Sequence, residues 1–573
     1  MVTLTIDGRK VTVEEGTTIL EAARSVGVKI PTLCYLKDIN QIGACRVCMV
    51  EIEGRDHLVA SCNAPCEDGI VVNTNTQRVR DTRRLNVEMI LSKHNSSCTS
   101  CVRSGNCTLQ TLARDMNVLD LPFPLKPVYR EWDHSYPLIR DMSKCVNCMR
   151  CISVCDKIQD MHVWDVSGTG ARTGVAVRDR LDIMDAGCTF CGQCITHCPV
   201  GALRARDDTL KVFDAINDPE KITVVQVAPA VRAGWGDDLD LTREEASVPR
   251  MVAALKAIGF DYVFDTNFSA DLTIMEEGSE FIERMTHPGE YPMPMFTSCC
   301  PGWVRYVKIR HPELAGNLST AKSPQQMFGA VAKTYFAKKI GVDPSKIFCV
   351  SVMPCTAKKY ECAVEEVNDA GAGRDVDLSI TTREFVRMIK ACQIDPMTVG
   401  EAEFDDPLGE GTGAAVIFGT TGGVMEAALR SAYFLITGEN PDADAFSGVR
   451  GLDGWKERTF KAGDVTVRTA VANGLGNATK LIDALQSGKV HYDFVEIMAC
   501  PTGCGGGGGQ PIVDGEELGG ARGQKLYQLD REAHTRFSHE NSSVQRLYEE
   551  FLGAPLSHEA HHLLHTDIKA WKL

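Results

Sequence analysis

The chain has 573 residues, more than one hydrophobic core can organise, so several domains are expected. Its formal net charge of −15 argues against nucleic acid as a partner, and no apolar run is long enough to span a bilayer. The N-terminal segment lacks the features of a secretory signal, so we expect a cytoplasmic protein. In that compartment, 24 cysteines predict metal ligands rather than disulfides.

Residues 1–80 are expected to form a small β-grasp-like domain in which a strand pair leads into a helix. The domain contains four cysteines with the spacing C-x10-C-x2-C-x13-C: Cys34, Cys45, Cys48 and Cys62. This spacing resembles the plant-type ferredoxin arrangement for a 2Fe–2S cluster, with a longer first gap. Zinc is the alternative, but zinc sites favour two paired C-x2-C knuckles and only one is present. Cys66 is interpreted as a spare thiol.

Residues 81–122 carry a second ligand set with the spacing H-x3-C-x2-C-x5-C. Its members are His94, Cys98, Cys101 and Cys107. We predict a 4Fe–4S cluster in which the imidazole replaces the fourth thiolate, which makes the cluster less negative and raises its reduction potential. The alternative is a zinc site in which His94 is the fourth ligand.

Residues 123–210 contain an internal repeat, because the run C-x2-C-x2-C-x3-C occurs twice. In bacterial two-cluster ferredoxins, the fourth cysteine of each such run ligates the other cluster. The first predicted 4Fe–4S cluster therefore has the ligands Cys145, Cys148, Cys151 and Cys198. The second has the ligands Cys188, Cys191, Cys194 and Cys155. Pro199 follows its cysteine as in those ferredoxins, whereas Asp156 replaces the proline of the first run.

From residue 211 onward the pattern changes to alternating strands and helices. The predicted elements are strands at 221–229 and 346–354, helices at 248–260 and 323–341, and a strand–turn–helix unit at 414–435. Ser323 is expected to cap its helix, with Pro324 at the first helical position. The order of elements predicts largely parallel sheets covered by helices.

The fold class is therefore α+β and α/β multidomain, with an α/β domain at 211–573 that ends in a short helical cap from about residue 525. In parallel sheets, sites collect beyond the carboxyl ends of strands. Three cysteine motifs follow predicted strands: TSCCPGW, MPCTAKKYE and EIMACPTGC. They supply Cys300, Cys355, Cys500 and Cys504, the ligand number of one cubane 4Fe–4S cluster.

Together with the upstream cysteine runs, these motifs resemble the long-form catalytic subunit of iron-only (FeFe) hydrogenases over nearly the whole chain. The resemblance implies reversible conversion of two protons and two electrons into H2. It also implies an H-cluster, in which the cubane is joined through Cys504 to a two-iron subsite with CO, cyanide and an azadithiolate bridge. Thr502 replaces a glycine of the family's usual third motif.

The resemblance assigns further residues to the surroundings of the two-iron subsite. Lys358 can offer a charge-assisted hydrogen bond to a cyanide ligand. Pro229 and Ala230 match a turn that can place a backbone donor near the second cyanide. The remaining lining positions are Gln325, Met353 and Met498. Methionine thioethers suit a dry pocket around a redox metal, and plain core packing is a compatible alternative.

A proton path is also implied by the resemblance. Cys299 is not needed as a cubane ligand and takes the position of the proton donor. The other relay positions are Glu277, Ser319, Glu280 and Arg284. Helical spacing puts both glutamates on one face, which without the resemblance would be interpreted as a solvated face with a surface ion pair. A buried glutamate would have a raised pKa, suited to passing protons near neutral pH.

An H2-converting enzyme is favoured over a non-catalytic iron–sulfur assembly or sensory protein of related fold, because Cys299, Lys358 and the glutamate pair are retained. An electron-relay subunit similar to those of NADH dehydrogenases would share the N-terminal domains and lack the three C-terminal motifs. Neither alternative explains the whole set of residues.

The electron partner is predicted from smaller signals. No strand–GxGxxG–helix unit is convincing, so NAD(P) is not expected to bind this chain. The tail at 557–566 and the Gly-rich segment at 503–511 resemble those of hydrogenase subunits in NAD(P)-linked complexes. We therefore expect a hetero-oligomer in which a flavin-bearing NAD(P)-binding subunit docks near the 2Fe–2S or His-ligated cluster. Electron bifurcation with ferredoxin is compatible with this expectation and is not established by the chain. A stand-alone ferredoxin-dependent enzyme is the alternative; no membrane partner is expected.

Overall fold

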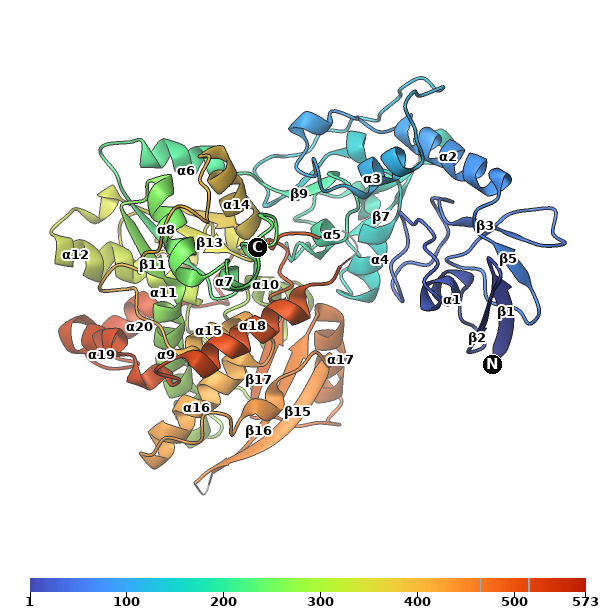
Figure 1. The fold of residues 1–573 in the computed structure, drawn as a ribbon. Coiled ribbons are helices and arrows are strands. Elements are labelled where there is room, and N and C mark those ends of the chain that lie inside the picture. The colour runs from blue at the N-terminus through green and yellow to red at the C-terminus, as the bar shows by residue number, and fades with distance from the viewer. Residues whose placement is uncertain (464, 514–515, 573) are drawn as a thin grey trace. The chain divides into compact units, whose positions relative to one another are not determined.

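The computed structural model describes residues 1–463, 465–513 and 516–572 (Figure 1). The chain divides into two compact units. Unit 1 comprises Met1–Ile158, His162–Ala186 and Gln193–Arg204, and unit 2 comprises Gln159–Met161, Gly187–Gly192 and Ala205–Leu573. Within the described ranges, the search for a helix of sufficient length and apolarity to cross a membrane finds none. The finer division into four domains stays a prediction.

Unit 1 begins with a five-stranded mixed sheet in the order β2-β1-β5-β3-β4. Its strands are β1 (Val2–Ile6), β2 (Arg9–Val13), β3 (Met49–Ile52), β4 (Val59–Ala60) and β5 (Val71–Asn73). Helix α1 (Ile19–Ser25) starts at Thr18, whose hydroxyl accepts a hydrogen bond from the Glu21 amide at 3.3 Å. The helix buries Leu20 against the sheet residues Ile6 and Val72. The predicted β-grasp arrangement is confirmed.

The remainder of unit 1 consists of short elements that carry cysteine-rich loops. These are α2 (Gln77–Leu91), α3 (Thr108–Asp115), β6 (Leu138–Arg140), α4 (Arg150–Lys157), β7 (Trp164–Ser167), β8 (Gly174–Val177), α5 (Gln193–Thr196) and β9 (Leu203–Ala205). Cys107 is the N-cap of α3, and Cys151 and Cys155 lie within α4. Helices thus begin at, or contain, several of the predicted ligands.

Unit 2 contains two four-stranded sheets. The first, β11-β10-β13-β14, is wholly parallel and consists of β10 (Ile222–Val227), β11 (Tyr262–Asp265), β13 (Ile347–Met353) and β14 (Leu378–Thr381). The second, β12-β17-β16-β15, consists of β12 (Met295–Phe296), β17 (Phe494–Met498), β16 (Val465–Asn473) and the antiparallel edge strand β15 (Trp455–Ala462). The prediction of largely parallel sheets is confirmed.

Helices cover these sheets, as the element order predicted. They are α6 (Thr209–Ile216), α7 (Val231–Gly234), α8 (Val248–Ile258), α9 (Thr266–Thr286), α10 (Pro301–Arg310), α11 (Pro324–Val331), α12 (Ala337–Ile340), α13 (Ala357–Glu361), α14 (Thr382–Ala391), α15 (Gly413–Val416), α16 (Gly423–Thr437) and α17 (Leu475–Gln486). The short strand β18 (Pro501–Cys504) follows β17. Helix α9 is long and buried over most of its length, which makes its polar residues unusual.

The helix predicted at 323–341 is present, with a π-helical turn between α11 and α12. Pro324 is at the first helical position as predicted. Ser323 is at the N-cap, but its hydroxyl makes no capping bond; it donates instead to Glu361 at 3.0 Å. The capping role predicted for this side chain is therefore wrong, because a buried carboxylate competes for the hydroxyl.

The strand predicted at the start of 414–435 is also wrong, since Gly413–Val416 form helix α15. Thr412 caps this helix by accepting a hydrogen bond from the Ala415 amide at 3.4 Å. The later helix, α16, is confirmed. Periodicity cannot assign a short apolar run that is buried on every side, because strand and helix then look alike.

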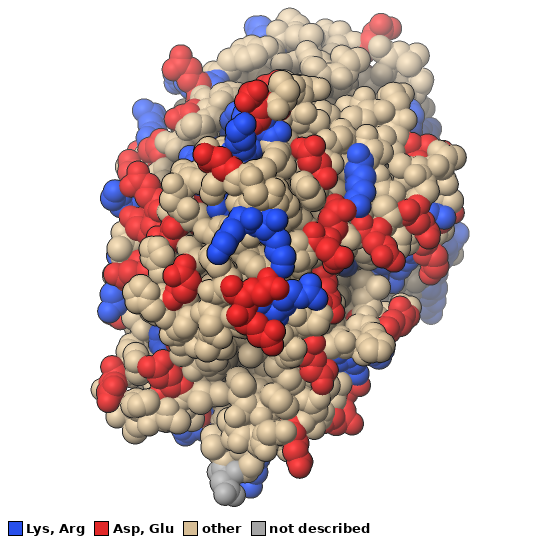
Figure 2. All heavy atoms as spheres, turned by 90° about the vertical axis from the view of Figure 1, so that its left-hand side faces the viewer, with Lys and Arg blue, Asp and Glu red and all other residues tan. Residues whose placement is uncertain are grey.

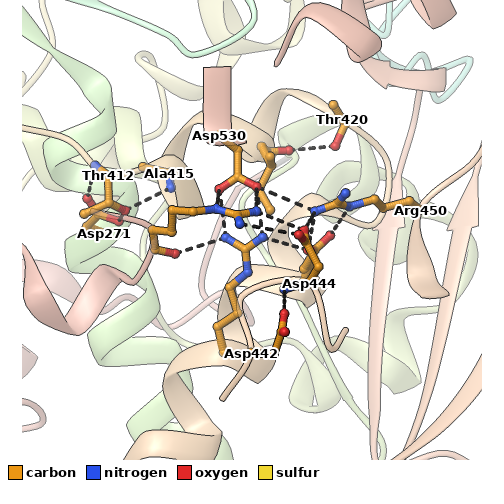
Figure 3. A network of polar contacts seen from close by, with 12 residues as sticks. Asp271, Thr412, Ala415, Thr420, Asp442, Asp444, Arg450 and Asp530 are labelled. Carbon is orange, nitrogen blue, oxygen red and sulfur yellow. Dashed lines mark hydrogen bonds and ion pairs between the residues drawn. The ribbon is translucent and has the colours of Figure 1, made fainter. Parts of the chain in front are cut away.

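The C-terminal segment forms the predicted helical cap, which starts at α18 (Gly519–Glu532) and continues through α19 (Ser542–Leu547) and α20 (His558–Leu564). An ion-pair network ties α18 to α16, as Figure 3 shows. Arg430 of α16 is fully buried and pairs with Asp530 of α18 at 2.9 Å. Arg450 lies 2.7 Å from Glu426 in the same network. Removing one member would leave a buried charge unpaired, so the network anchors the cap.

On the face of the molecule drawn in Figure 2, acidic and basic side chains are interspersed between uncharged ones. Mixed charge of this kind favours solubility and marks no single-sign binding surface on that face.

Candidate active site

The four cysteines of the C-terminal motifs gather in unit 2 at the ends of strands. Cys300 follows β12 as the N-cap of α10, Cys355 follows β13, and Cys504 ends β18. Burial and the nearby Cys300 thiol raise the pKa of Cys355 to about 12. Burial and the charges of Cys355, Cys300 and Cys504 likewise raise the pKa of Cys500. The mutual effect shows that distant motifs bring their thiols together, as a cubane requires.

A cavity of about 80 Å³ lies against three of these cysteines. Its lining includes Cys300, Cys355, Cys504, Cys299, Lys358, Pro229, Ala230, Gln325, Met353 and Met498. Each non-ligand residue predicted to surround the two-iron subsite therefore lies on one cavity. Phe418, Thr266 and Ala270 also line it and were not predicted.

The cavity suits a redox metal group joined to a cubane. Thiols on one wall can serve as metal ligands, thioethers and Phe418 keep the space dry, and Lys358 brings a positive charge to it. Such a combination can bind an anionic iron centre, because the cation offsets its charge where water is scarce. The residues present fit the H-cluster that the sequence predicts.

Lys358 is held in place by two acceptors. Its Nζ donates to Oε2 of Glu361 at 2.8 Å and to the backbone carbonyl of Cys299 at 3.1 Å. Burial disfavours its charged form, but the Glu361 carboxylate and nearby thiolates outweigh this and raise the pKa of Lys358. The side chain is therefore an ammonium ion at neutral pH.

Glu361 is a buried hub that sequence reasoning missed. Its Oε2 accepts hydrogen bonds from Lys358, from Ser323 at 3.0 Å and from the Gln325 amide at 3.0 Å. The Gln325 side-chain carbonyl accepts from Ser351 at 2.7 Å. The K-x-x-E spacing within α13 was the available signal, since i,i+3 residues are neighbours on a helix.

Glu277 of α9 lies buried beside Cys299 with both carboxylate oxygens lacking a hydrogen-bond partner among the described residues. Burial, reinforced by the charge of Glu280, raises the pKa of Glu277 to about 8. Its charge in turn raises the pKa of Cys299, after the larger effect of burial. Orphaned buried oxygens are rare, and here they face the cavity-lining thiol.

The remaining predicted relay residues adjoin one another. Ser319 donates to Oε2 of Glu280 at 2.7 Å, and the Thr320 amide donates to the same atom at 3.0 Å. Arg284 donates to Oε1 of Glu280 at 3.0 Å and to the Leu318 carbonyl at 2.9 Å. Glu280 therefore accepts several well-formed hydrogen bonds. Glu277 accepts none of that geometry among the described residues, although the nearby Ser319 hydroxyl and Ser298 amide partly offset the rise of its pKa.

The C-terminal cap contributes a second polar cluster beside this row. Oε2 of Glu276, next to Glu277 in α9, lies 3.0 Å from Nε2 of His565. Nδ1 of His565 lies 2.8 Å from the Thr320 hydroxyl. Tyr548 donates to the other Glu276 oxygen at 2.5 Å. The C-terminal tail thus packs against the predicted relay residues of unit 2.

Glu496, the first residue of the third motif, is a further buried carboxylate without a predicted role. It accepts backbone hydrogen bonds from Gly422 and Met425, both at 2.7 Å, at the start of α16. Burial raises the pKa of Glu496 to about 7. A carboxylate at a helix N-terminus fixes the loop before α16 against β17.

The third motif tolerates Thr502 because that residue lies in the extended strand β18. Glycines make room for its side chain: a Cβ at Gly506 or Gly519 would collide with the Thr502 hydroxyl. Gly503 is the residue that must be glycine. Its φ is +68°, and a Cβ added there would lie only 2.6 Å from the Thr421 amide nitrogen.

In unit 1, the four cysteines predicted for the 2Fe–2S cluster meet. The Cys34 thiol contacts Cys45 and Cys62, and Cys48 contacts Cys62. Cys66 is buried apart from these contacts, and burial alone raises its pKa, as expected of a spare thiol.

His94 is also oriented for ligation. Its Nδ1 lies 3.0 Å from the Lys144 carbonyl, which leaves Nε2 for a metal. Burial lowers the pKa of His94, which favours the neutral imidazole that binds metals. The charge of Cys101 contributes to the raised pKa of Cys107, so these two predicted ligands lie near each other.

In unit 1, Cys198 of the second run lines one small cavity with three cysteines of the first, which is the arrangement that the predicted cross-ligation requires. The three cysteines are Cys145, Cys148 and Cys151. For the other cluster, Cys188 and Cys191 belong to unit 2, and Cys155 and Cys194 belong to unit 1. That ligand set stays a prediction.

The glycine run after Cys504 packs tightly within unit 2. A Cβ at Gly509 would lie 2.8 Å from the Cys355 amide nitrogen, and one at Gly508 would collide with the Cys191 carbonyl. Cys191 in turn contributes to the raised pKa of Cys500. Small residues therefore let a predicted ferredoxin-cluster ligand approach a predicted cubane ligand.

Comparisons with known proteins cover most of the chain. Residues 221–508 match the family model described as iron only hydrogenase large subunit, C-terminal domain, and 517–571 match iron hydrogenase small subunit. Upstream, 1–77 match a 2Fe-2S iron-sulfur cluster binding domain. Residues 83–121 match the NADH-ubiquinone oxidoreductase-G iron-sulfur binding region, and 144–202 match a 4Fe-4S dicluster domain.

Two relatives are similar over nearly their whole length. NADP-reducing hydrogenase subunit HndD of Solidesulfovibrio fructosivorans is 47% identical over 99% of this chain and 98% of its own. Iron hydrogenase 1 of Clostridium pasteurianum is 39% identical over 99% of this chain and 100% of its own. Among solved structures, a variant of the FeFe-hydrogenase HydA1 of Chlamydomonas reinhardtii is 43% identical, with a TM-score of 0.57, over 63% of this chain and 98% of that one.

Proposed function

The chain belongs to the iron-only hydrogenases, and on that premise we propose how its residues serve the interconversion of H2 with protons and electrons. The H-cluster, when bound, supplies the redox chemistry of the H–H bond. We propose Cys300, Cys355, Cys500 and Cys504 as its protein ligands. The support is that three of these thiols line one cavity and the fourth is electrostatically coupled to them.

Lys358 would hold the cofactor's anionic ligands, which we propose to be cyanide, accompanied by CO and an azadithiolate bridge. A buried ammonium group makes short, strong hydrogen bonds to anionic acceptors. Its position on the cavity wall and its fixation by Glu361 support this role. Pro229, Ala230, Gln325, Met353 and Met498 would complete the cofactor's surroundings by excluding water.

Protons would move between solvent and cavity through Cys299 and Glu277. A carboxyl group with a pKa of about 8 gives and takes protons readily at neutral pH, which an ordinary glutamate does not. Ser319 and Glu280 would carry the path outward, and Arg284 would hold Glu280 in position. The observation that carries this proposal is the unpartnered Glu277 carboxylate beside the cavity thiol.

Electrons would travel through one 2Fe–2S and three further 4Fe–4S clusters, one of them ligated by His94. Gathered thiols in the 2Fe–2S segment and around the Cys198 cavity support two of these clusters. The route would end where Cys191 approaches Cys500 within unit 2.

We propose that the electron partner is an NAD(P)-linked, flavin-bearing subunit in a hetero-oligomer. The similarity to a subunit named NADP-reducing hydrogenase supports this, with ferredoxin as an additional or alternative partner. We place the complex in the cytoplasm, because a chain with 24 cysteines for cluster ligation needs a reducing compartment.

The test is direct. Protein loaded with the complete H-cluster should evolve H2 from reduced methyl viologen and show CO and cyanide bands in the infrared. A fully loaded protein with neither property would contradict the proposed function.

A further inference from the structure

Unit 1 contains a groove of about 970 Å³ between α2, α3 and the loop that follows α1. We call it the α2 groove. Five cationic residues line it: Arg24, Lys29, Arg80, Arg83 and Arg84. Two acidic residues, Asp81 and Asp115, face them. The excess of positive charge contrasts with a chain whose formal net charge is −15.

The cations of the α2 groove are only partly neutralised. Arg24 pairs with Glu21 and Arg84 pairs with Glu88, both at 2.9 Å. Lys29 and Arg80 are exposed and have no ion-pair partner in the part of the chain that the structure describes. A concave surface with unpaired cations focuses positive potential and attracts an anionic partner.

The floor of the groove leads to a predicted cluster. Arg83 is buried, and its Nε and one Nη donate to the Met49 carbonyl at 2.9 and 2.6 Å. Met49 directly follows the predicted 2Fe–2S ligand Cys48. On the other wall, α3 starts at the predicted ligand Cys107. A partner in the groove would touch the supports of two electron-carrying sites.

The size and surroundings of the groove favour a protein over a small anion. Its volume far exceeds that of a phosphate group. The lining also includes apolar side chains, among them Val28, Leu112 and Met116. Apolar contacts flanked by charges are typical of protein interfaces, whereas a small-anion site needs only donors.

We propose that the α2 groove is the docking site of an acidic electron-transfer protein, which passes electrons to or from the adjoining 2Fe–2S cluster. The inference rests on the proposed hydrogenase function. It goes further in naming the surface, the sign of the partner's charge and the cluster reached first.

The test uses the fully loaded full-length enzyme and a reduced two-4Fe–4S ferredoxin of net negative charge as probe. In the double variant Lys29→Glu/Arg80→Glu, the KM for this ferredoxin should rise about tenfold or more, with kcat nearly unchanged. Raising the salt concentration should raise the wild-type KM in the same direction. The matched control Lys10→Glu reverses an exposed charge on β2, outside the groove, and should leave the KM unchanged.

Viologen-driven H2 evolution separates the possible failures. The viologen-driven rate should be equal in the wild type and the double variant, because viologen needs no docking site. A wild-type enzyme that evolves no H2 from reduced viologen would contradict the hydrogenase function rather than the docking site. If the double variant does not fold, the single variants Lys29→Gln and Arg80→Gln replace it. Each should raise the KM for ferredoxin by a smaller factor. An unchanged KM for ferredoxin in the double variant would overturn the proposal. It would also be overturned if the two substitutions changed the inhibition of the enzyme by NADPH and left the KM for ferredoxin as it is.

Discussion

Nζ of Lys358 lies 2.8 Å from Oε2 of Glu361 and thereby presents a fixed positive charge to the central cavity. The same carboxylate oxygen also accepts hydrogen bonds from Ser323 and Gln325. The cation is thus positioned by a residue that itself need not contact the cofactor.

Glu361→Gln keeps the shape of the hub and removes its charge. Hydrogen bonds to charged groups contribute about 1.5–3 kcal/mol, so H2 turnover should fall on the order of 10- to 100-fold as Lys358 loses its position. Infrared spectra should show shifted cyanide bands. The control is Glu365→Gln, whose carboxylate pairs with Lys572 at the surface and should have no effect. Unaltered bands and turnover in Glu361→Gln would rule out the positioning role.

Glu277 predicts how activity depends on pH. With a pKa of about 8, the acid form predominates below that pH and the carboxylate above it. Viologen-driven H2 evolution needs the acid form and should fall as the pH rises through about 8. H2 oxidation needs the carboxylate and should fall as the pH drops through the same range. Rate profiles in both directions measure this, and coincident profiles would argue against Glu277 as the relay group.

Glu277→Gln cannot exchange protons and should lose turnover by about 100-fold or more in both directions. A suitable control is Glu283→Gln on the same helix, because Glu283 accepts a hydrogen bond from the exposed Tyr291 and lies outside the path. Equal losses in the two variants would point to damage of α9 rather than to proton transfer.

The pairing of His565 with Glu276 predicts a structural effect of the C-terminal cap. In His565→Ala, a buried carboxylate loses a partner, which costs about 1–3 kcal/mol. The cap should then open more often, and proteolysis within residues 533–572 should become faster. His562→Ala, which removes an exposed histidine of the preceding helix α20, should not change the cleavage rate. Identical rates for the two variants would show that the pair does not anchor the cap.

Substitutions at the neighbouring residues Gly503 and Thr502 should have opposite effects on the cubane. Gly503→Ala forces a Cβ into positive φ and against the backbone of Thr421, so it should disrupt the Cys500–Cys504 loop and lower cubane occupancy. Thr502→Gly removes a side chain from an extended position and should leave the cubane intact. Iron content and the electron paramagnetic resonance signal of the reduced cubane distinguish the two. Full occupancy in Gly503→Ala would contradict the geometric argument.

The parts predicted from the sequence are those whose residues lie close together in the chain or at strand ends. Each C-terminal cysteine motif lies at the end of a strand, so parallel-sheet geometry could anticipate that Cys300 and Cys500, which follow the paired strands β12 and β17, lie near one another. Likewise, the spacing within α9 was enough to put Glu277 and Glu280 on one face.

The parts that were missed depend on contacts between residues far apart in the sequence. His565 meets Glu276, which lies 289 residues earlier in the chain, and nothing in the tail specifies that partner. Ser323 looked like a helix cap because local spacing says nothing of the buried Glu361 nearby. The apolar run at 414–419 was assigned to a strand because complete burial removes the periodicity that separates strand from helix.

The central claim is that the cavity is a catalytic centre supplied with protons through Cys299, whose pKa is raised by burial and by Glu277. Its most direct test is viologen-driven H2 evolution by Cys299→Ala, measured with the resonance signal of its cubane. The account predicts that turnover is almost abolished while the cubane signal persists. Undiminished turnover, or loss of the cubane, would contradict it.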